Sequence, residues 1–472
     1  MKAPLLSLIV SGGVVLAPPL RAVEDAGLKF AFGPKPVPGA ALVKPEEAYN
    51  VNRGYGYDLG SKVEVVNRGG ADPLAAGFTT GASGRPFFFS TKLGPGAYRV
   101  TITLGDATQE TVATVKSETR RLMLEAVHVP AGQTRAFTFL VHVRVPQIPG
   151  DGMVALKARE KEPILYVQWD ENDPTTRLPF LELDWDERLT LEFSDAHPAL
   201  CAVDIADAGH PPTVYLVGDS TMTDQMMEPW AAWGQMFPRW FKSTLLVANY
   251  AESGESARSF LGERRWPKLM SEVQAGDFVL IQFGINDRGT PLDQFKQYFR
   301  TFVTDTRAHG ATPLLVTSQN LRKLGEHGEG INTLGGYPDA MREVAAELTV
   351  PLIDLNVMSM KLYAAIGPDE LPKMFVDGTH QNDYGAYQLA KCVVQGVIDA
   401  KLPVAAQVVD DWKPFDRAHP DAMAEFKLPR DPQLDPSRPG GPGAPGRRGP
   451  MAGDARPAAA APAKPAPAPS SK

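Results

Sequence analysis

The spacing of hydrophobic and polar residues changes once along the chain, between residues 193 and 214. Before this point, from about residue 30, short segments alternate apolar and polar positions between turns rich in Gly, Pro and Asp. Such period-two alternation is typical of antiparallel strands, and several of them in a row predict a β-sandwich. The clearest segments are YRVTITLGD (98–106), RLMLEAVHV (121–129), AFTFLVHVRV (136–145) and RLTLEF (188–193).

Beyond residue 214 the pattern consists of near-continuous apolar runs separated by amphipathic helices. Apolar runs of four to seven residues are typical of strands that are buried on both faces, and helices between such strands place them parallel in one sheet. The second half therefore predicts a doubly wound α/β domain. The runs are VYLV (214–217), LLVAN (245–249), FVLIQFG (278–284), PLLVTS (313–318) and PLIDL (351–355).

The two ends of the chain differ in composition from these domains. Residues 1–22 carry a lysine, an apolar run and a small-residue cleavage site, which indicate a signal peptide and export to the periplasm or the cell exterior. Residues 425–472 are rich in Pro, Ala and Gly, so we expect a solvated tail, with a spacer or a contact to wall polymers as the alternative. We assign residues 27–205 to the β-sandwich and residues 212–405 to the α/β domain.

The composition of the chain limits the kinds of molecule that we expect it to bind. The 472 residues carry 48 Lys and Arg against 55 Asp and Glu, a net charge of −7, so no basic surface suggests a nucleic-acid partner. After the leader no apolar stretch is long enough to span a membrane, so we expect no membrane partner. Cys201 and Cys392 fall in different expected elements, and a disulfide between them is not predicted. We expect a monomer.

Small polar residues and glycine follow three of the expected strands, where a doubly wound sheet presents its ligand-binding loops. Ser220 stands in VGDSTMTD (217–224), Gly254 in NYAESGESARSF (249–260) and Asn286 in GINDRG. Each segment alone could be an ordinary strand-to-helix turn with its cap. Taken together, the N–H groups of Ser220 and Gly254 and the amide of Asn286 are candidate donors to an oxyanion.

An acid and an imidazole complete the set in FVDGTHQNDYGAYQLA (375–390), where Asp377 precedes His380 by three residues, ahead of an expected helix over 384–397. A serine hydroxyl becomes a nucleophile when an imidazole accepts its proton, and a carboxylate fixes the imidazole's tautomer. Ser220, His380 and Asp377 therefore predict a triad for acyl transfer. The remaining histidines show no metal-ligand spacing, and we expect neither a metal nor another cofactor.

These segments resemble the SGNH or GDSL hydrolases, named for Ser, Gly, Asn and His in four successive blocks, and among them the rhamnogalacturonan acetylesterases. The resemblance implies a three-layer, flavodoxin-like hydrolase domain with Ser220 as nucleophile, His380 as base and Asp377 orienting it. It also implies an oxyanion hole of Ser220, Gly254 and Asn286. The likeness runs through VYLVGDSTMTDQ, WAAWGQ, NYAESGESARSF, VLIQFGINDRG, GGYPDAMREVA, VPLIDLN and FVDGTHQNDYGA, nearly all of 214–400.

The resemblance further implies a substrate and a second domain. It points to a secreted esterase that removes O-acetyl groups from pectin-like cell-wall polysaccharide. Members with the GDSTMTDQ form often carry an amino-terminal sandwich similar to galactose-binding modules, and YNVNRGYGYDLG (49–60) looks like the start of one.

Two positions depart from the family's pattern. Ile285 stands where His is common, and Glu255 stands where Arg is common. We expect both to flank the cleft, where an acidic Glu255 would repel a galacturonate. Other acetylated glycans, such as xylan oligosaccharides, are therefore the alternative substrates.

Three further interpretations stay open. Trp230, Trp233 and Trp240 could stack on sugar rings, although their spacing favours packing in the core. Residues 169–187 gather carboxylates that could hold calcium, although a solvated loop is more common. A carbohydrate-binding protein with an inert hydrolase domain is the alternative from another class, but it would have no physical reason to keep an imidazole beside a serine and a carboxylate.

Overall fold

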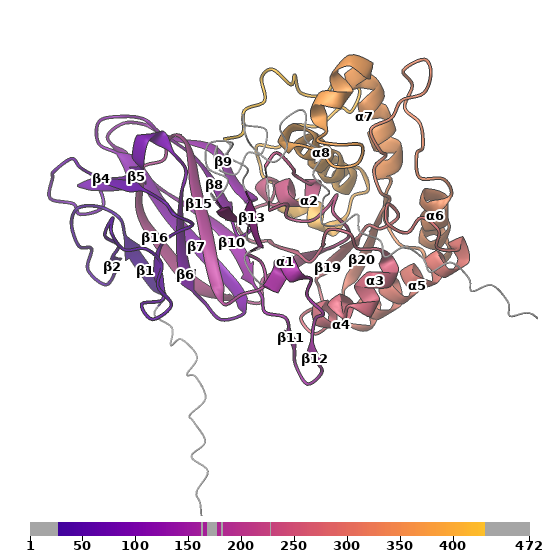
Figure 1. Ribbon diagram of the computed structural model, residues 1–472, viewed down its shortest axis with the longest axis horizontal. Coiled ribbons are helices and arrows are strands. Elements are labelled where there is room, and N and C mark those ends of the chain that lie inside the picture. The colour runs from indigo at the N-terminus through magenta and orange to yellow at the C-terminus, as the bar shows by residue number, and fades with distance from the viewer. Residues whose placement is uncertain (1–26, 162–163, 168–176, 181–182, 227, 430–472) are drawn as a thin grey trace, which may run out of the picture.

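The two halves of the chain differ in architecture and pack directly against each other (Figure 1). The computed structural model describes residues 27–161, 164–167, 177–180, 183–226 and 228–429. The expected signal peptide lies outside these residues, as does the expected tail beyond residue 429. Among the helices that the structure describes, none has both the length and the apolar character needed to cross a membrane.

Two sheets make up the first half. One has the order β10-β7-β16-β1-β2, with β5 beside β16 and β4 beside β5, and the other has the order β3-β6-β15-β8-β9. Neighbouring strands are antiparallel except for the β1–β2 pair, which is parallel. The strands are β1 (Leu28–Ala31), β2 (Ala41–Leu42), β3 (Tyr55–Asp58), β4 (Val63–Asn67), β5 (Gly77–Gly81), β6 (Phe87–Lys92), β7 (Gly96–Asp106), β8 (Thr111–Ser117), β9 (Arg121–Val129), β10 (Gln133–Val143), β15 (Arg188–His197) and β16 (Leu200–Gly209).

One hydrophobic cluster joins these two sheets. Val100 and Ile102 of β7 contribute to it from one sheet, and Leu191 and Phe193 of β15 contribute from the other. Their spacing of two residues puts each pair on one face of its strand. The alternation in the sequence therefore corresponds to antiparallel strands that bury every second side chain between two sheets.

Short elements lie between β10 and β15 of the first half. The hairpin of β11 (Gln147–Ile148) and β12 (Gly152–Met153) is followed by α1 (Ala158–Lys161) and the hairpin of β13 (Ile164–Val167) and β14 (Arg177–Phe180). A further single turn, η1 (Ala82–Gly84), lies within the first half.

A five-stranded parallel sheet forms the centre of the second half. Its order is β18-β17-β19-β20-β21, which is 2-1-3-4-5 in chain order, so the connections reverse direction between β17 and β19. Ligands bind open α/β sheets at such a reversal, beyond the carboxyl ends of the strands. The strands are β17 (Thr213–Val217), β18 (Leu246–Asn249), β19 (Phe278–Ile281), β20 (Thr312–Val316) and β21 (Leu352–Ile353).

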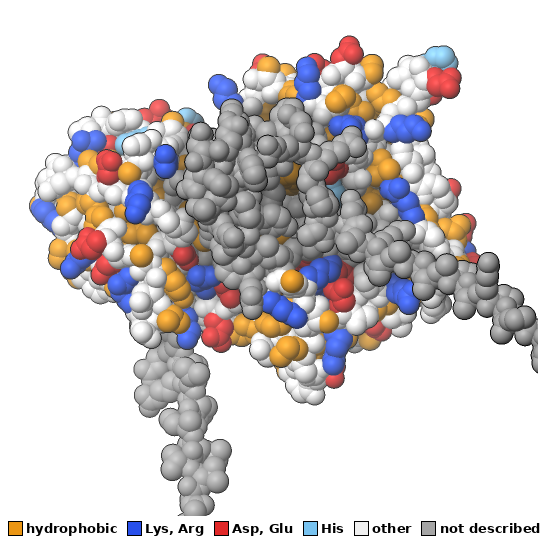
Figure 2. All heavy atoms as spheres, viewed as in Figure 1, with side chains coloured by type: hydrophobic (Ala, Val, Ile, Leu, Met, Phe, Trp, Pro, Cys, Tyr) orange, Lys and Arg blue, Asp and Glu red, His pale blue; other side chains and the backbone are white. Residues whose placement is uncertain are grey.

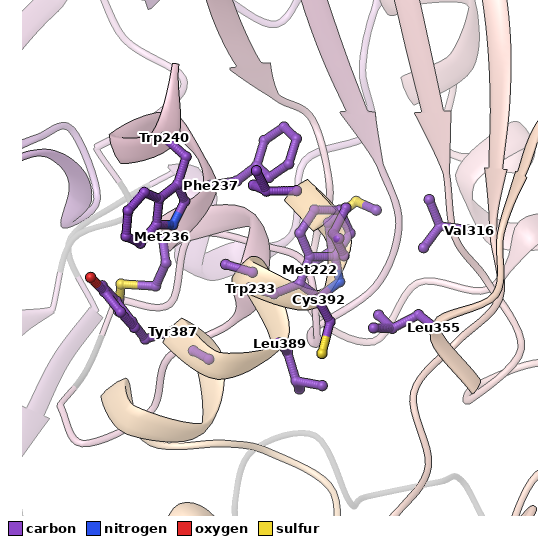
Figure 3. Close-up of a cluster of buried hydrophobic side chains, with 14 of the residues drawn as sticks. Met222, Trp233, Met236, Phe237, Trp240, Val316, Leu355, Tyr387, Leu389 and Cys392 are labelled. Carbon is purple, nitrogen blue, oxygen red and sulfur yellow. The ribbon is translucent and has the colours of Figure 1, made fainter. Parts of the chain in front are cut away.

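Helices cover both faces of this sheet. Val214 and Leu216 of β17 pack in one cluster with α2, α7 and α8 (Figure 3), and Tyr215 and Val217 pack in another with α3 to α6. Because successive side chains of a strand point to opposite faces, continuous apolar runs are what a doubly covered sheet requires. The helices are α2 (Trp233–Met236), η2 (Phe237–Trp240), α3 (Ala257–Gly262), α4 (Arg265–Met270), α5 (Leu292–Ala308), α6 (Tyr337–Leu348), α7 (Leu355–Glu370), η3 (Leu371–Met374), α8 (Asp383–Asp399) and η4 (Pro403–Gln407).

The structure decides several of the open interpretations. Trp233 and Trp240 are buried in the core, as their spacing favoured, whereas Trp230 is half-buried. Cys201 and Cys392 are buried free thiols. Part of 169–187 lies outside the described residues, and among the described ones no group of three or more His, Cys, Asp and Glu side chains is placed to hold a metal ion.

Surface charge is mixed in sign. In Figure 2 the Lys and Arg side chains lie among Asp and Glu side chains on the described part of the visible face. Neither sign covers that face continuously, in keeping with the small net charge of −7.

The cluster of Figure 3 predicts a clear difference between two leucine truncations. Leu389 of α8 is fully buried, whereas Leu292 at the start of α5 is 42% exposed. Leu389→Ala should lower the free energy of unfolding by about 2–5 kcal/mol, because it leaves a cavity. Leu292→Ala should change it by about 0.5 kcal/mol or less. Urea unfolding of both variants measures this, and equal losses would contradict the placement of the core.

Candidate active site

Ser220 lies in a tight turn directly after β17. The turn is closed by hydrogen bonds from the N–H groups of Met222 and Thr223 to the Asp219 carbonyl oxygen, at 3.0 and 3.1 Å. Gly218 allows the close approach of the next strand, because a Cβ there would lie 2.9 Å from the Gln282 carbonyl oxygen. The side chain of Ser220 remains at the edge of the sheet, and the residue is 6% exposed.

His380 connects Ser220 to Asp377. Its Nε2 lies 2.9 Å from Ser220 Oγ, and its Nδ1 lies 2.8 Å from Asp377 Oδ2. The other carboxylate oxygen of Asp377 accepts hydrogen bonds from the N–H groups of Thr379 and His380, at 2.7 and 2.8 Å. The three residues predicted as a triad therefore form one hydrogen-bonded line.

The ionisation of Asp377 fixes the tautomer of His380. Burial raises the pKa of Asp377, but the hydrogen bonds from His380 and Thr379 outweigh burial and lower it to about 2. An ionised carboxylate can only accept hydrogen bonds, so Nδ1 of His380 carries the proton that lies between them. In neutral His380 the Nε2 is then free to accept the hydroxyl proton of Ser220.

Backbone contacts hold the serine and histidine loops together. The N–H of Ala231, beyond Ser220 in the chain, donates to the Gln381 carbonyl oxygen at 3.0 Å, and Gln381 also pairs with Phe375 on the near side of the histidine loop. The side chain of Asn382 accepts a hydrogen bond from the Gly385 N–H and so caps α8. The base is thus placed by a cap and a bridge rather than by a flexible loop.

The loop that contains Gly254 is tied to the serine turn, and the loop that contains Asn286 is tied to the Gly254 loop. The Glu252 N–H donates to the Gly218 carbonyl oxygen at 3.1 Å, and Asn286 Nδ2 donates to the Glu255 carbonyl oxygen at 2.9 Å. Gly254 has a φ of +82°, a conformation that favours glycine. An amide NH₂ has two hydrogens, so Asn286 can donate a second hydrogen bond.

Glu255 is not the cleft-facing acid that the sequence suggested. The side chain has no exposed surface, and it pairs with Lys157 and accepts a hydrogen bond from Ser259 Oγ at 2.6 Å. Arg265 Nε lies 3.6 Å from the same carboxylate. The expectation that Glu255 would repel an acidic substrate is therefore wrong, because its charge is buried and neutralised. Ile285 is also buried.

Two buried carboxyl groups flank the site. Burial raises the pKa of Asp219 to about 6, against hydrogen bonds from the N–H and hydroxyl of Thr221. Burial likewise raises the pKa of Asp287 to about 7, against a hydrogen bond from the Ala257 N–H, and the charge of Asp219 raises it further. Oδ2 of each side chain has no hydrogen-bond partner within the described residues.

The sequence analysis missed two residues that touch the serine loop from the first half. Arg121 Nε and Nη2 donate to Asp224 Oδ2 at 2.9 and 2.6 Å, and Arg120 Nη1 donates to the Trp230 carbonyl oxygen at 3.0 Å. Both arginines are buried. The available signal was the pair of adjacent arginines at the start of the apolar segment RLMLEAVHV.

The raised pKa of Asp287 predicts that the stability of the folded protein depends on pH. A carboxyl pKa of about 7 in the folded state, against an ordinary 3.8, means that the folded protein holds this proton more tightly. The contribution of Asp287 to stability therefore falls as the pH rises from about 4 to 7. Asp287→Asn has no carboxyl group at this position and lacks this dependence. The free energy of unfolding of Asp287→Asn minus that of the wild type should therefore rise across that window, by a total on the order of 4 kcal/mol.

Urea unfolding at pH 4, 5, 6, 7 and 8 measures this difference. Asp204→Asn, an exposed position on β16, is the matched control and should run parallel to the wild type. Parallel curves for Asp287→Asn would contradict the raised pKa.

Comparisons with known proteins identify relatives of the chain that contains this site. Residues 216–387 match the sequence profile of the GDSL-like Lipase/Acylhydrolase family. The rhamnogalacturonan acetylesterase RhgT of Bacillus subtilis (strain 168) is 40% identical over 220 residues, which cover 42% of this chain and 95% of RhgT.

A second relative aligns over more of the chain. The uncharacterized esterase YxiM of Bacillus subtilis (strain 168) is 26% identical over 395 residues, 80% of this chain and 92% of YxiM. The crystal structure of YxiM superposes with a TM-score of 0.41 at 23% identity, covering 80% of this chain and 99% of that one. On the match to RhgT, the chain belongs to the GDSL/SGNH hydrolase family and is a carboxylic ester hydrolase.

Proposed function

We propose that this protein is a carbohydrate esterase that removes O-acetyl groups from plant cell-wall polysaccharide of the rhamnogalacturonan or pectin type. The observation that carries the proposal is the hydrogen-bonded line of Ser220, His380 and Asp377 at the switch point of the parallel sheet. The substrate class is supported by the 40% identity to RhgT, a rhamnogalacturonan acetylesterase.

The proposed reaction begins with nucleophilic attack by Ser220. Its Oγ forms a bond to the acetyl carbonyl carbon while His380 Nε2 takes the hydroxyl proton over a 2.9 Å contact. The ionised Asp377 stabilises the resulting imidazolium through Nδ1. The tetrahedral intermediate collapses when the bond to the sugar oxygen breaks, and His380 returns the proton to that oxygen.

An acetyl-serine intermediate remains after the sugar leaves. Water then attacks its carbonyl carbon, with His380 accepting a proton from the water, and acetate departs as the proton returns to Ser220 Oγ. Both half-reactions place negative charge on the acetyl carbonyl oxygen. We assign its stabilisation to the N–H groups of Ser220 and Gly254 and to the amide of Asn286. None of these steps requires a metal or another cofactor.

The buried state of Glu255 removes the objection to an acidic polysaccharide. Its carboxylate is paired with Lys157, and Arg265 lies nearby, so no bare negative charge at this position opposes a galacturonate. The expected repulsion by Glu255, which was the reason for considering a neutral xylan oligosaccharide, therefore no longer applies. Acetylated xylan remains the second candidate, to be distinguished by assay.

We also propose the setting in which the enzyme acts. The first 22 residues favour export, and an insoluble cell-wall polymer is met outside the cytoplasm. We further propose that the two facing antiparallel sheets form a galactose-binding-like module that holds the polymer, as the family resemblance implies.

A panel of acetylated substrates tests the substrate class. Acetate release should be faster from acetylated rhamnogalacturonan than from acetylated xylan at equal acetyl content. Ser220→Ala should abolish release from both, by several orders of magnitude, because the residual rate lacks a nucleophile. A faster reaction on xylan would overturn the proposed substrate, and substantial turnover by folded Ser220→Ala would overturn the proposed site.

Variants of Asn286 and of its neighbour Ile285 distinguish a loss of oxyanion stabilisation from a loss of packing. An amide donor acts on charge that is largely absent in the ground-state ester, so Asn286→Ala should lower kcat with little change in KM. The expected loss is about 3 kcal/mol, roughly a hundredfold to a thousandfold in rate. Ile285→Ala removes buried apolar volume and should mainly lower thermal stability.

Both variants are measured for kcat, KM and melting temperature on one small acetyl ester. Because Asn286 also donates to the Glu255 carbonyl, a fall in stability accompanies its loss, and kcat must be expressed per folded enzyme. Equal kcat losses at the two positions would count against the role of Asn286.

A further inference from the structure

The turn between β8 and β9 of the first half is buried against the second half. Its residues Glu118, Thr119 and Arg120, and Arg121 at the start of β9, are each 6% exposed or less. Glu118 and Arg120 have positive φ angles of 51° and 59°, which non-glycine residues seldom adopt. A strained turn that buries this many charges persists only where its surroundings hold it in place.

Arg120 makes the central contacts of this turn. Its Nη1 donates to the carbonyl oxygens of Gln225 and Trp230 at 3.1 and 3.0 Å. Its Nη2 lies 3.2 Å from Glu228 Oε1 and 3.3 Å from Asp383 Oδ1. One guanidinium therefore joins the segment that follows Ser220 to the first residue of α8.

The contacts of Arg120 on both loops are close to the reacting residues Ser220 and His380. Gln225, whose carbonyl binds Arg120, donates from its Nε2 to the Ser220 carbonyl oxygen at 2.6 Å. Asp383 begins α8, three residues after His380. Arg120 thus links the nucleophile's loop to the base's loop, and the gap between them is the 2.9 Å contact from His380 Nε2 to Ser220 Oγ.

Arg121 and Thr119 support the same loop from either side. Arg121 binds Asp224, whose other oxygen accepts a hydrogen bond from Asn249 Nδ2 at the end of β18. The Thr119 carbonyl oxygen accepts a hydrogen bond from Gln235 Nε2 of α2 at 3.0 Å. The turn therefore meets the loop after Ser220 through several bonds, and Arg120 also contacts Asp383 of α8.

We infer that Arg120 is a positioning residue for the esterase reaction, supplied by the antiparallel half to hold the serine and histidine loops at their reacting distance. The inference rests on the roles proposed for Ser220 and His380. It makes the first half part of the active site and not only a module for holding polymer. It also gives the guanidinium a specific task, because four acceptors in different directions match its forked donors and exceed what a lysine ammonium can reach.

The experiment compares Arg120→Lys and Arg120→Ala with Glu125→Gln in the full chain. Glu125 of β9 pairs with Arg239 Nε at 3.1 Å and accepts a hydrogen bond from the Tyr387 hydroxyl of α8 at 2.8 Å. It therefore contacts the same helix as Arg120, but both of these partners lie outside the serine loop. For each variant, kcat and KM on a small acetyl ester, the melting temperature and the folded fraction from near-ultraviolet circular dichroism are measured.

Loss of the connection should lower kcat per folded enzyme while leaving KM for a small ester within about twofold, because a misplacement of about 1 Å can cost roughly a hundredfold. We expect a roughly tenfold loss in Arg120→Lys and a larger loss in Arg120→Ala. Added guanidinium chloride at low millimolar concentration should partly restore kcat in Arg120→Ala. Glu125→Gln should keep kcat within about twofold even if its melting temperature falls.

The results separate this inference from the proposed function. Unchanged kcat in folded Arg120→Lys, with only a lower melting temperature, would overturn the positioning role, as would an equal kcat loss in Glu125→Gln. If Arg120→Ala does not fold, Arg120→Lys alone decides. Activity retained by Ser220→Ala on the same ester would instead overturn the proposed site, whatever the Arg120 variants do.

Discussion

The 2.9 Å contact between Ser220 Oγ and His380 Nε2 is the constraint on which the rest of the site depends. The two residues are 160 positions apart and stand in loops on different elements, so nothing local in the chain sets their separation. The structure sets it through fixed elements. The turn after β17 fixes the serine, the capped start of α8 and the Ala231–Gln381 bridge fix the histidine, and Arg120 joins the two loops. Proton transfer is sensitive to such distances, which explains why so many buried polar contacts surround one hydrogen bond.

Burying these charges has an energetic cost that stability alone does not justify. Arg121 and Asp224 are both nearly inaccessible to solvent, and removing two charges from water costs several kcal/mol per ion before their attraction is counted. Replacing such pairs with apolar side chains is often neutral or stabilising. Their value here lies in direction, because Arg121 Nε and Nη2 both donate to Asp224 Oδ2 and so orient that side chain. The ionic network thus specifies where the serine loop lies rather than how firmly the halves adhere.

Much of this arrangement could be predicted from the sequence because it is recorded in local patterns. Apolar runs marked the strands of the parallel sheet, and Ser220, Asp377 and His380 stood where loops at the carboxyl edge begin or end. The environment of Glu255 could not be predicted, because its partners, Lys157 and Arg265, come from segments that only the tertiary fold brings to it. The same holds for Arg120, whose partners lie more than 100 residues away. Residue type and spacing identify chemistry, but burial and pairing depend on packing between the halves.

The two halves are mutually dependent in a way that an alignment of the hydrolase region does not reveal. RhgT aligns over 95% of its own length to 42% of this chain, so most of this chain has no counterpart in it. In this chain Asp224 and Glu228 stand in the serine loop as buried carboxylates, and arginines of the antiparallel half neutralise them. A loop that carries such groups would have to expose them to water or take up protons if that half were absent. The acidic residues of the serine loop and the arginines Arg120 and Arg121 therefore depend on each other. Neither group would be stable in its present position without the other.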